Sequence, residues 1–309
     1  WKGFGAATKG KLTRLTDSNP WLADRLMGKQ EGIVYKAQDG LEIGGLLIHP
    51  IGKVAKKGAP LIVQVHGGPE SHYRNGWVTS YSNLGQVAAG RGFAVFFPNY
   101  RGSTGRGVAY SKADHHDPAG KEFQDIVDGV NYLAEQKIID KARVGSMGGS
   151  YGGYASAWAA TFYSKHYKAA AVFVGVSDQI SKIGTTDITN EMITVHFRKK
   201  PWENWDFFLK RSPIYYAHQS TTATLILHGK ADTRVDPGQS RELYRHLKIR
   251  GKGPVRLVLY PGEGHGNRMA AARLDYHLRT LRWMERFLKG SAKDVPDSDI
   301  DYKKELDNK

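Results

Sequence analysis

Apolar and polar residues alternate in blocks along the chain from residue 61 onward. Short, continuous apolar runs rich in β-branched and aromatic residues are separated by longer stretches in which apolar residues recur at helical spacing. Runs of this length and composition are typical of strands that are buried on both faces of a sheet. The pattern predicts strands at Leu61–Val65, Phe93–Phe97, Arg143–Ser146, Ala169–Val176, Leu225–His228 and Val255–Tyr260.

The stretches between these runs predict helices. Alternation of strands and helices indicates an α/β fold with a mainly parallel central sheet that is flanked by helices on both faces. The aromatic-rich segment Gly184–Gln219 interrupts the alternation and predicts a helical insertion over one end of the sheet. Two further strands precede the first apolar run, at Gly32–Ala37 and Leu46–Pro50, and the helices are expected at Asp125–Gln136, Gly153–Tyr163, Ser240–Arg250 and Ala270–Lys289.

The pattern divides the chain into three parts. Residues 31–290 form the α/β domain, whereas residues 1–30 are rich in Gly, Lys and Thr and predict no stable element of their own. Residues 291–309 carry mixed charge and few apolar side chains, so we expect a flexible tail. The chain begins at Trp1 rather than Met, which leaves open whether an upstream segment was removed. The cytoplasm and the periplasm or cell exterior therefore both stay open as compartments.

Composition excludes several classes of protein. A hydrophobic fraction of 40% is enough for a core, and the absence of Cys excludes a disulfide scaffold, a Cys-ligated metal and a cysteine nucleophile. No apolar run approaches the roughly 18 residues that a membrane-spanning helix needs. The net charge is +15, but the basic residues are scattered and do not alternate with aromatic residues. We therefore expect no nucleic-acid partner and no membrane span.

The most informative motif is Gly148-Gly-Ser-Tyr-Gly152, which has the pattern G-x-S-x-G. In this pattern the serine lies at the apex of a sharp strand-to-helix turn, where glycines two positions before and after it avoid steric clashes. An apolar strand precedes Ser150 and a helical stretch follows it, as the turn requires. Ser146 is a nearby competitor, but Val144 occupies the position where that serine would need a glycine. The sequence predicts Ser150 as the nucleophile of an α/β-hydrolase fold.

A serine nucleophile needs a histidine base that is held by a carboxylate, and in this fold the acid and then the histidine follow the serine along the chain. Asp232 follows one predicted strand, and His265 follows the next in a glycine-rich loop. We expect these two residues to complete a triad. The same stretches hold weaker alternatives: Asp236 precedes a proline and opens a turn, we expect Glu263 to face solvent, and we expect His228 to be packed and hydrogen-bonded.

Attack on a carbonyl creates an oxyanion, which needs fixed N–H donors. One donor is expected to be the backbone N–H of Tyr151, the residue after the nucleophile. The other should come from the loop after the first buried strand, His66-Gly-Gly-Pro69, where glycines let the backbone approach a substrate. We assign this second donor to Gly68, with Gly67 as the alternative, and expect His66 to be a structural hydrogen-bonding residue.

Together these motifs resemble the prolyl oligopeptidase family of serine peptidases, and most closely its acylaminoacyl-peptidase and dipeptidyl-peptidase-like branch. The resemblance implies a peptidase that hydrolyses oligopeptides through Ser150, Asp232 and His265 and an acyl-enzyme intermediate. In that branch an Arg before Ser-Pro helps to hold the substrate backbone, so Arg211 is implied as a substrate-binding residue; the alternative is a surface Arg that ends the insertion. The motifs that carry the resemblance are 66-HGGP-69, 98-PNYRGSTG-105, 148-GGSYGG-153, 228-HGKAD-232 and 262-GEGHG-266.

Family members usually carry an N-terminal β-propeller, for which this chain has no room. Residues 1–30 resemble the segment that leaves such a propeller, so we expect the chain to be the catalytic part of a longer protein. The same triad would serve a carboxylesterase that acts on small esters, which is the alternative function, and a non-catalytic binding module is a third. Side-chain preference, exo- or endopeptidase action and oligomeric state stay open.

Two further groups of polar residues predict no additional chemistry. His115-His-Asp117 is a short run without further metal ligands nearby, so we expect a polar loop and no metal. The Gly-rich stretch 102–107 lacks the Lys that ends a phosphate-binding loop, and we expect no cofactor. Asp125 and Asp128 are expected to be solvated charges on a helix surface.

Overall fold

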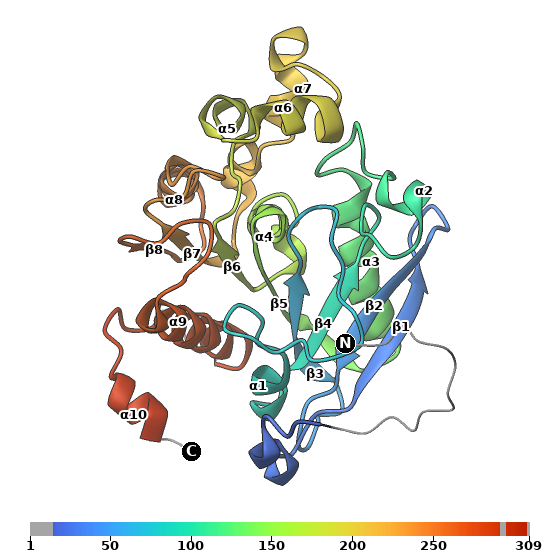
Figure 1. The fold of residues 1–309 in the computed structure, drawn as a ribbon, viewed down its shortest axis with the longest axis vertical. Helices are drawn as coiled ribbons and strands as arrows, with labels where there is room; N and C mark the ends of the chain where they lie inside the picture. The colour runs from blue at the N-terminus through green and yellow to red at the C-terminus, as the bar shows by residue number, and fades with distance from the viewer. Residues whose placement is uncertain (1–14, 291–294, 308–309) are drawn as a thin grey trace.

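The computed structural model describes residues 15–290 and 295–307. A twisted eight-stranded sheet runs through this part of the chain in the order β1-β2-β4-β3-β5-β6-β7-β8 (Figure 1). β2 pairs antiparallel with β1 and β4, and the strands from β4 to β8 pair in parallel. The strands are β1 (Gln30–Lys36), β2 (Glu42–Ile48), β3 (Ala59–Val65), β4 (Ala94–Asn99), β5 (Ile139–Gly149), β6 (Ala169–Phe173), β7 (Ala223–Gly229) and β8 (Val255–Tyr260).

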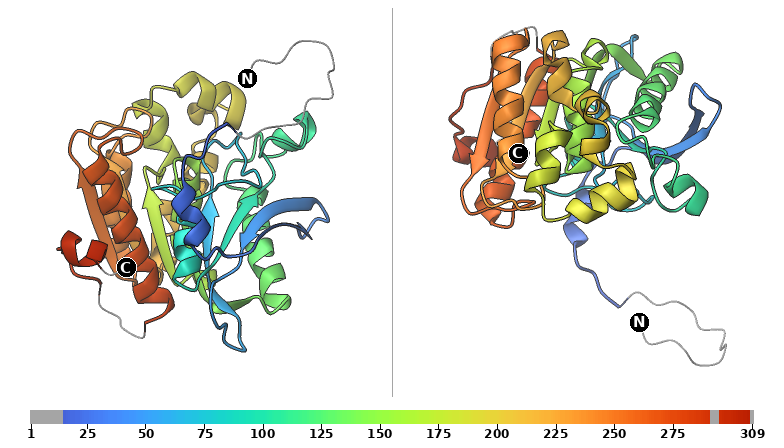
Figure 2. Two further views of the ribbon diagram at one scale, coloured as in Figure 1. Left: turned by 60° about the horizontal axis from the view of Figure 1, so that its bottom comes forward. Right: turned by 90° about the horizontal axis from the view of Figure 1, so that it is seen from above.

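Helices cover both faces of this sheet, as the views in Figure 2 show. One face packs against α3 (Lys121–Glu135), α4 (Tyr151–Ala160) and α8 (Gly238–Arg250), and the other packs against α1 (Gly85–Gly90) and α9 (Ala270–Leu288). Every residue of β3 and β7 is buried, which explains why their sequences are mainly apolar. The predicted α/β-hydrolase fold is confirmed.

The segment between β6 and β7 forms the predicted helical insertion. It lies beyond the end of the sheet at the top of Figure 1 and has a small core of its own, made by Ile183, Met192, Phe197 and Phe208. This core is separate from the three clusters that pack on the sheet, so the part of the insertion that forms it packs as a distinct cap, whereas Ile214 and Ala217 of the last helix pack with the sheet. Its helices are α5 (Gln179–Thr185), α6 (Thr189–Glu191), η3 (Met192–Phe197), η4 (Pro201–Glu203), α7 (Trp205–Lys210) and η5 (Pro213–Gln219).

The described part of the C-terminal tail contacts the domain, and its flexibility stays a prediction. Val295 packs against the core beneath α9, and Arg279 donates a hydrogen bond to the carbonyl of Ser298 at 2.8 Å. The short helix α10 (Tyr302–Asp307) is joined to α9 because the Tyr302 hydroxyl donates to Asp275 Oδ1. Residues 291–294 and 308–309 of the tail lie outside the described residues, as do residues 1–14 of the N-terminal segment.

The remaining short helices lie in connections where the sequence predicted none. They are η1 (Pro20–Asp24), α2 (Val108–Ser111) and η2 (Ser164–His166). The first of them falls in the segment 1–30, where no stable element was expected. In the part of the chain that the structure describes, no helix has both the length and the apolar composition that crossing a bilayer demands.

Candidate active site

Ser150 lies at the apex of the turn between β5 and α4. Its backbone has φ 58° and ψ −119°, a conformation that costs energy for any residue with a Cβ. Neighbouring strands hold it there, since the Ser150 N–H donates to the carbonyl of Phe173 at 3.1 Å. A Cβ at Gly148 would lie 2.5 Å from Val65 O, and one at Gly152 would lie 2.2 Å from the same oxygen. The two glycines therefore let the turn press against β3, as the motif predicts.

The competing serine has a different environment. Ser146 lies within β5 and is buried, and its hydroxyl is 3.2 Å from that of Ser156. Ser150, in contrast, lines a cavity at the carboxyl end of the sheet. Of these two serines, only Ser150 has a hydroxyl that a substrate can reach, which supports Ser150 as the nucleophile.

Asp232 follows β7 and has a fully buried carboxylate with four hydrogen-bond donors. Oδ1 accepts from the backbone N–H groups of Arg234 at 2.9 Å and Val235 at 3.0 Å. Oδ2 lies 2.8 Å from His265 Nδ1 and 3.1 Å from His228 Nε2. Burial alone would raise the pKa of Asp232, but the bonds from the two histidines outweigh it and hold the pKa well below its usual range. The acid is therefore a carboxylate at neutral pH.

His265 follows β8 and is oriented by this carboxylate. A carboxylate oxygen can only accept, so His265 Nδ1 carries the proton and Nε2 is left as a proton acceptor. Among the residues that the structure describes, Ser150 Oγ and His265 form no hydrogen bond. Catalytic hydrogen bonds are often long before substrate binds. The structure thus brings the predicted acid and base together, at the same edge of the sheet as Ser150.

His228 is packed and hydrogen-bonded, as expected, and it also contacts the predicted acid. Its Nε2 lies 2.8 Å from the carbonyl of Val235, so this nitrogen carries a proton that it shares with Asp232 Oδ2. Its Nδ1 lies 2.6 Å from the hydroxyl of Ser240. This second donor to Asp232 was not predicted from the sequence. Its position four residues before Asp232, at the end of a buried strand, could have indicated it.

The other two alternatives have structural roles. Asp236 Oδ1 accepts from the N–H of Gly238 at 2.6 Å and so opens α8, as its place before a proline predicted. Glu263 does not face solvent, contrary to expectation: it is 2% exposed and accepts from the backbone N–H groups of Arg268 at 2.7 Å and Met269 at 3.0 Å. These bonds close the loop that carries His265, and they offset the cost of burying a charge.

The loop after β3 passes directly beside Ser150. A Cβ at Gly67 would lie 3.2 Å from Ser150 Cβ, which is closer than most side chains approach. Gly68 lines the same cavity as Ser150 and Tyr151, and its φ of 130° favours glycine. His66 is buried, stacks on Tyr100 and is 2.8 Å from the hydroxyl of Ser103. Burial lowers the pKa of His66 to about 4, in keeping with a neutral structural residue.

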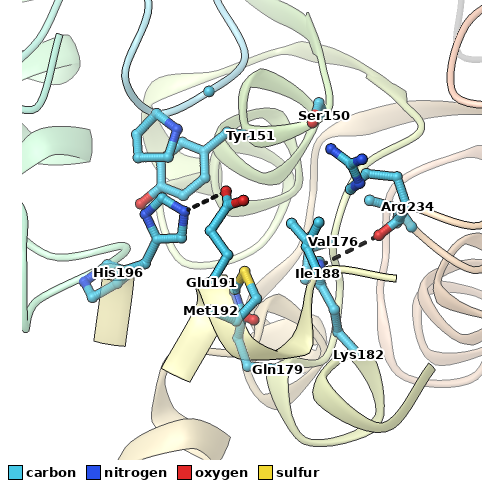
Figure 3. Close-up of a pocket in the computed structure, with 14 residues that line it drawn as sticks. Ser150, Tyr151, Val176, Gln179, Lys182, Ile188, Glu191, Met192, His196 and Arg234 are labelled. Atoms are coloured by element: carbon cyan, nitrogen blue, oxygen red, sulfur yellow. Dashed lines mark hydrogen bonds and ion pairs between the residues drawn. The ribbon is translucent and has the colours of Figure 1, made fainter. Parts of the chain in front are cut away.

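The cavity beside Ser150 has a volume of about 70 Å³ and opens between the sheet and the insertion (Figure 3). The loop after β3 and the turn at Ser150 form one wall. The insertion and the loop after β7 form the others. The residues that line it are Gly68, Pro69, Pro118, Ser150, Tyr151, Val176, Gln179, Lys182, Ile188, Glu191, Met192, His196, Arg234 and Val235.

Arg211 does not line this cavity. Its guanidinium pairs with Asp117 and donates to the carbonyl of Ala119 at 2.9 Å, and it lies against the ring of Phe207. It borders a separate hollow that also contains Trp158. Its assignment as a substrate-binding residue therefore stays a prediction, and its position outside the Ser150 cavity does not support it.

The expectation that Asp125 and Asp128 are solvated surface charges is wrong. Asp125 is not a solvated surface charge: it is 1% exposed and forms a two-pronged ion pair with Arg101, with distances of 2.7 and 2.8 Å. Asp128 is also buried and accepts from the N–H of Gln38. His115 lies near Glu70 at 3.5 Å, and no group of His, Asp or Glu among the described residues is arranged to hold a metal ion.

Comparison with known proteins places this chain in a family. Residues 79–291 match the prolyl oligopeptidase family. The chain belongs to that family. An uncharacterized peptidase of Bacillus subtilis, YuxL, is 32% identical over 254 residues, which cover 82% of this chain and 38% of YuxL. The acylamino-acid-releasing enzyme of Rattus norvegicus is 32% identical over 268 residues, which cover 84% of this chain and 35% of that enzyme.

The fold has a close counterpart among solved structures. The acylaminoacyl peptidase of Pyrococcus horikoshii superposes with a TM-score of 0.83 at 29% identity, over 95% of this chain and 47% of that protein. The chain thus spans less than half the length of these relatives. Membership of a family of serine peptidases favours a peptidase over the carboxylesterase alternative.

Proposed function

We propose that this chain is the catalytic domain of a serine peptidase that cleaves oligopeptides, with Ser150 as nucleophile, His265 as base and Asp232 as acid. The observation that carries the proposal is the bond of 2.8 Å from His265 Nδ1 to the buried Asp232 carboxylate, at the sheet edge where Ser150 lines a cavity. That bond fixes the histidine tautomer that a general base requires. The names of the relatives, acylamino-acid-releasing enzyme and dipeptidyl aminopeptidase, support a peptide substrate.

The mechanism follows from these positions. Ser150 Oγ attacks the peptide carbonyl carbon while its proton passes to His265 Nε2, and Asp232 stabilises the resulting imidazolium. The oxyanion accepts hydrogen bonds from the backbone N–H of Tyr151 and of Gly68, or of Gly67 as the alternative. His265 then protonates the leaving amine, and the C–N bond breaks to leave an acyl-enzyme. Water attacks the ester by the reverse sequence of proton transfers and frees Ser150.

The test combines covalent labelling with hydrolysis. The wild-type protein should react with a fluorophosphonate probe and cleave an N-acyl aminoacyl anilide. Ser150→Ala should lose labelling and lower kcat by on the order of 10⁴-fold or more. The matched control is Ser146→Ala, because Ser146 lies four residues away in β5 and its buried hydroxyl contacts that of Ser156; it should keep both properties. Labelling that persists in Ser150→Ala would refute the assignment.

The same assay decides between the two hydrolase functions. Aryl esters and aminoacyl anilides of the same acyl group should be offered side by side, since the ester is chemically easier to cleave. A peptidase hydrolyses both the esters and the anilides, and Ser150→Ala should abolish its hydrolysis of the anilides. A protein that hydrolyses the esters and leaves every anilide intact would instead be a carboxylesterase.

A further inference from the structure

A buried lysine lies in the wall of the cavity that contains Ser150. Lys182 lies on α5, is 3% exposed and lines the cavity together with Ser150 and Tyr151. Figure 3 shows its side chain running from α5 to the carbonyl oxygen of Arg234. An ammonium group that is removed from water in this way is costly unless an anion or several acceptors compensate it.

The protein itself compensates this ammonium only weakly. Lys182 Nζ donates to two neutral oxygens, Thr186 Oγ1 at 3.2 Å and Arg234 O at 3.4 Å. The second distance is long for such a bond. Within residues 15–290 and 295–307, no carboxylate lies within ion-pair distance of Nζ. An ammonium has three donors, so one remains for a ligand in the cavity.

The other charged groups of the cavity leave this position electropositive. Arg234 lines the cavity, and only its Nε is bonded to a carboxylate, that of Asp187 at 2.6 Å. Three carboxylates oppose this charge. Those of Glu191 and Asp187 are 51% and 42% exposed and pair with His196 and Arg234, and water screens exposed carboxylates far more than it screens a buried ammonium. The third, Asp232, is buried, but its oxygens already accept from four other donors, so it forms no ion pair with Lys182 among the described residues.

The cavity faces the acyl side of the scissile bond. Two of its walls are Gly68 and Tyr151, whose N–H groups are the proposed partners of the carbonyl oxygen. His265, which must protonate the leaving amine, is not among the residues that line it. A side chain that enters the cavity therefore belongs to the residue whose carbonyl Ser150 attacks.

We propose that this cavity binds an acidic side chain, that of Asp or Glu, on the residue whose carbonyl is attacked, and that Lys182 is its counter-ion. The proposal rests on the peptidase function proposed above and names its substrate class. The carboxylate would supply the anion that Lys182 lacks, in a cavity that Val176, Ile188 and Met192 line in part with apolar side chains. An apolar side chain in the same place would leave the ammonium unpaired.

The experiment compares substrates that differ at one position. N-acyl anilides of Glu, Gln and Leu are offered to the wild-type protein under identical conditions. Gln has nearly the shape of Glu without its charge, so the ratio of kcat/KM for Glu to that for Gln measures the contribution of the charge. We expect a ratio of about 10 to 100, the range of a hydrogen bond to a charged group. The ratio should fall toward 1 in Lys182→Met, while the Leu substrate is cleaved at least as well as by the wild type.

A second variant and a control make the test independent of folding. Lys248→Met removes an exposed lysine in the last turn of α8, outside the cavity, and should leave the ratio unchanged. Glu191→Gln removes the exposed carboxylate at the cavity and should increase the preference for Glu. A separate aliquot of each protein is titrated with the fluorophosphonate probe, which blocks the nucleophile irreversibly, and the rates of the unlabelled remainder are divided by that active-site concentration, so that only folded, active molecules are compared.

The pH dependence gives a further check on the wild type alone. Burial lowers the pKa of Lys182 to about 8; Arg234 lowers it too, whereas Asp187, Asp232 and Glu191 oppose the shift. The advantage of Glu over Gln should therefore decline as pH rises through about 8, because kcat/KM follows the ionisation of the free enzyme. The comparison with Gln cancels the titration of His265, which both substrates share.

The outcomes separate this inference from the proposed function. Cleavage of the Leu or Gln substrate as fast as the Glu substrate, by a wild-type protein of which a separate aliquot reacts with the probe, would overturn the role of Lys182 and leave the peptidase function intact. A preference for Glu that Lys182→Met retains would overturn it as well. A wild-type protein that neither reacts with the probe nor cleaves any anilide would overturn both.

Discussion

Replacing Asp232 by Asn should damage this site in two ways, because all four positions around the carboxylate are donors. An amide has one oxygen and one NH₂, so in either orientation its nitrogen faces two N–H groups. Backbone N–H groups cannot change, whereas a histidine can move its proton to the other ring nitrogen. The NH₂ group should therefore turn toward His265 and His228.

This orientation of the amide predicts the size of the loss in kcat and the size of the loss in stability. His265 would accept at Nδ1 and carry its proton on Nε2, where it can no longer take the proton of Ser150; a wrong tautomer of this kind costs about 10⁴-fold in kcat. His228 would also have to give up its Nε2 proton, which leaves the buried carbonyl of Val235 without its donor. One unsatisfied buried group costs about 1–3 kcal/mol, and the loss of bonds to a charged acceptor adds to it. We expect the free energy of unfolding to fall by about 3 kcal/mol.

The assay measures kcat with an aminoacyl anilide and stability by urea unfolding. Asp236→Asn is the matched control, because Asp236 only accepts from the N–H of Gly238 at the start of α8 and an Asn can do the same. It should keep kcat within about twofold and stability within about 0.5 kcal/mol. If Asp232→Asn kept kcat within tenfold of the wild type, the role of the 2.8 Å bond to His265 would be wrong.

Three further results are expected. Gly152→Ala should destabilise the protein by about 3 kcal/mol and abolish probe labelling, since its Cβ would lie 2.2 Å from Val65 O; normal labelling would contradict the packing of the turn. Burial and the charge of Glu70 raise the pKa of Asp114 from 3.8 to about 7. Its protonated form therefore contributes stability below pH 4 that is lost as pH rises through 7, at most about 4 kcal/mol. Urea unfolding from pH 4 to 8 should show this decline, and a decline of equal size in Asp114→Asn would argue against it. Lys182→Met should raise the stability by about 1 kcal/mol in urea, because it removes a buried charge without a paired anion; a loss of more than 1 kcal/mol would show that the ammonium is already compensated.

Most of the fold could be predicted because the central strands, such as β3 and β7, are buried and therefore carry mainly apolar sequences. The strands at 61–65, 225–228 and 255–260 lie within or coincide with β3, β7 and β8. The short helices α1 and α2 were missed, since helices of six and four residues are too short to show a period. The tail was expected to be flexible because it has few apolar residues. Hydrogen bonds to Arg279 and Asp275, distant in sequence, join its described part to α9.

The candidate site was partly predictable for a related reason. The motifs around Ser150, Asp232 and His265 are local, because each follows a strand whose carboxyl end lies at one edge of the sheet. The burial of Glu263 and Asp125 was not predictable from residue type, since charged side chains are usually exposed. Their donors come from the backbone of a closed loop and from Arg101, and only the folded chain brings these together.

The division of the cavity between two parts of the fold has an evolutionary consequence. The proposed catalytic residues lie on loops at the ends of β5, β7 and β8, whereas the insertion between β6 and β7 contributes Gln179, Lys182, Ile188, Glu191, Met192 and His196. Side-chain selectivity can therefore change in evolution, or be changed by exchanging this one insertion, while the proposed catalytic residues stay the same. A chimera that carries the corresponding insertion of a relative should acquire that relative's side-chain specificity and should react with the fluorophosphonate probe as fast as the wild type.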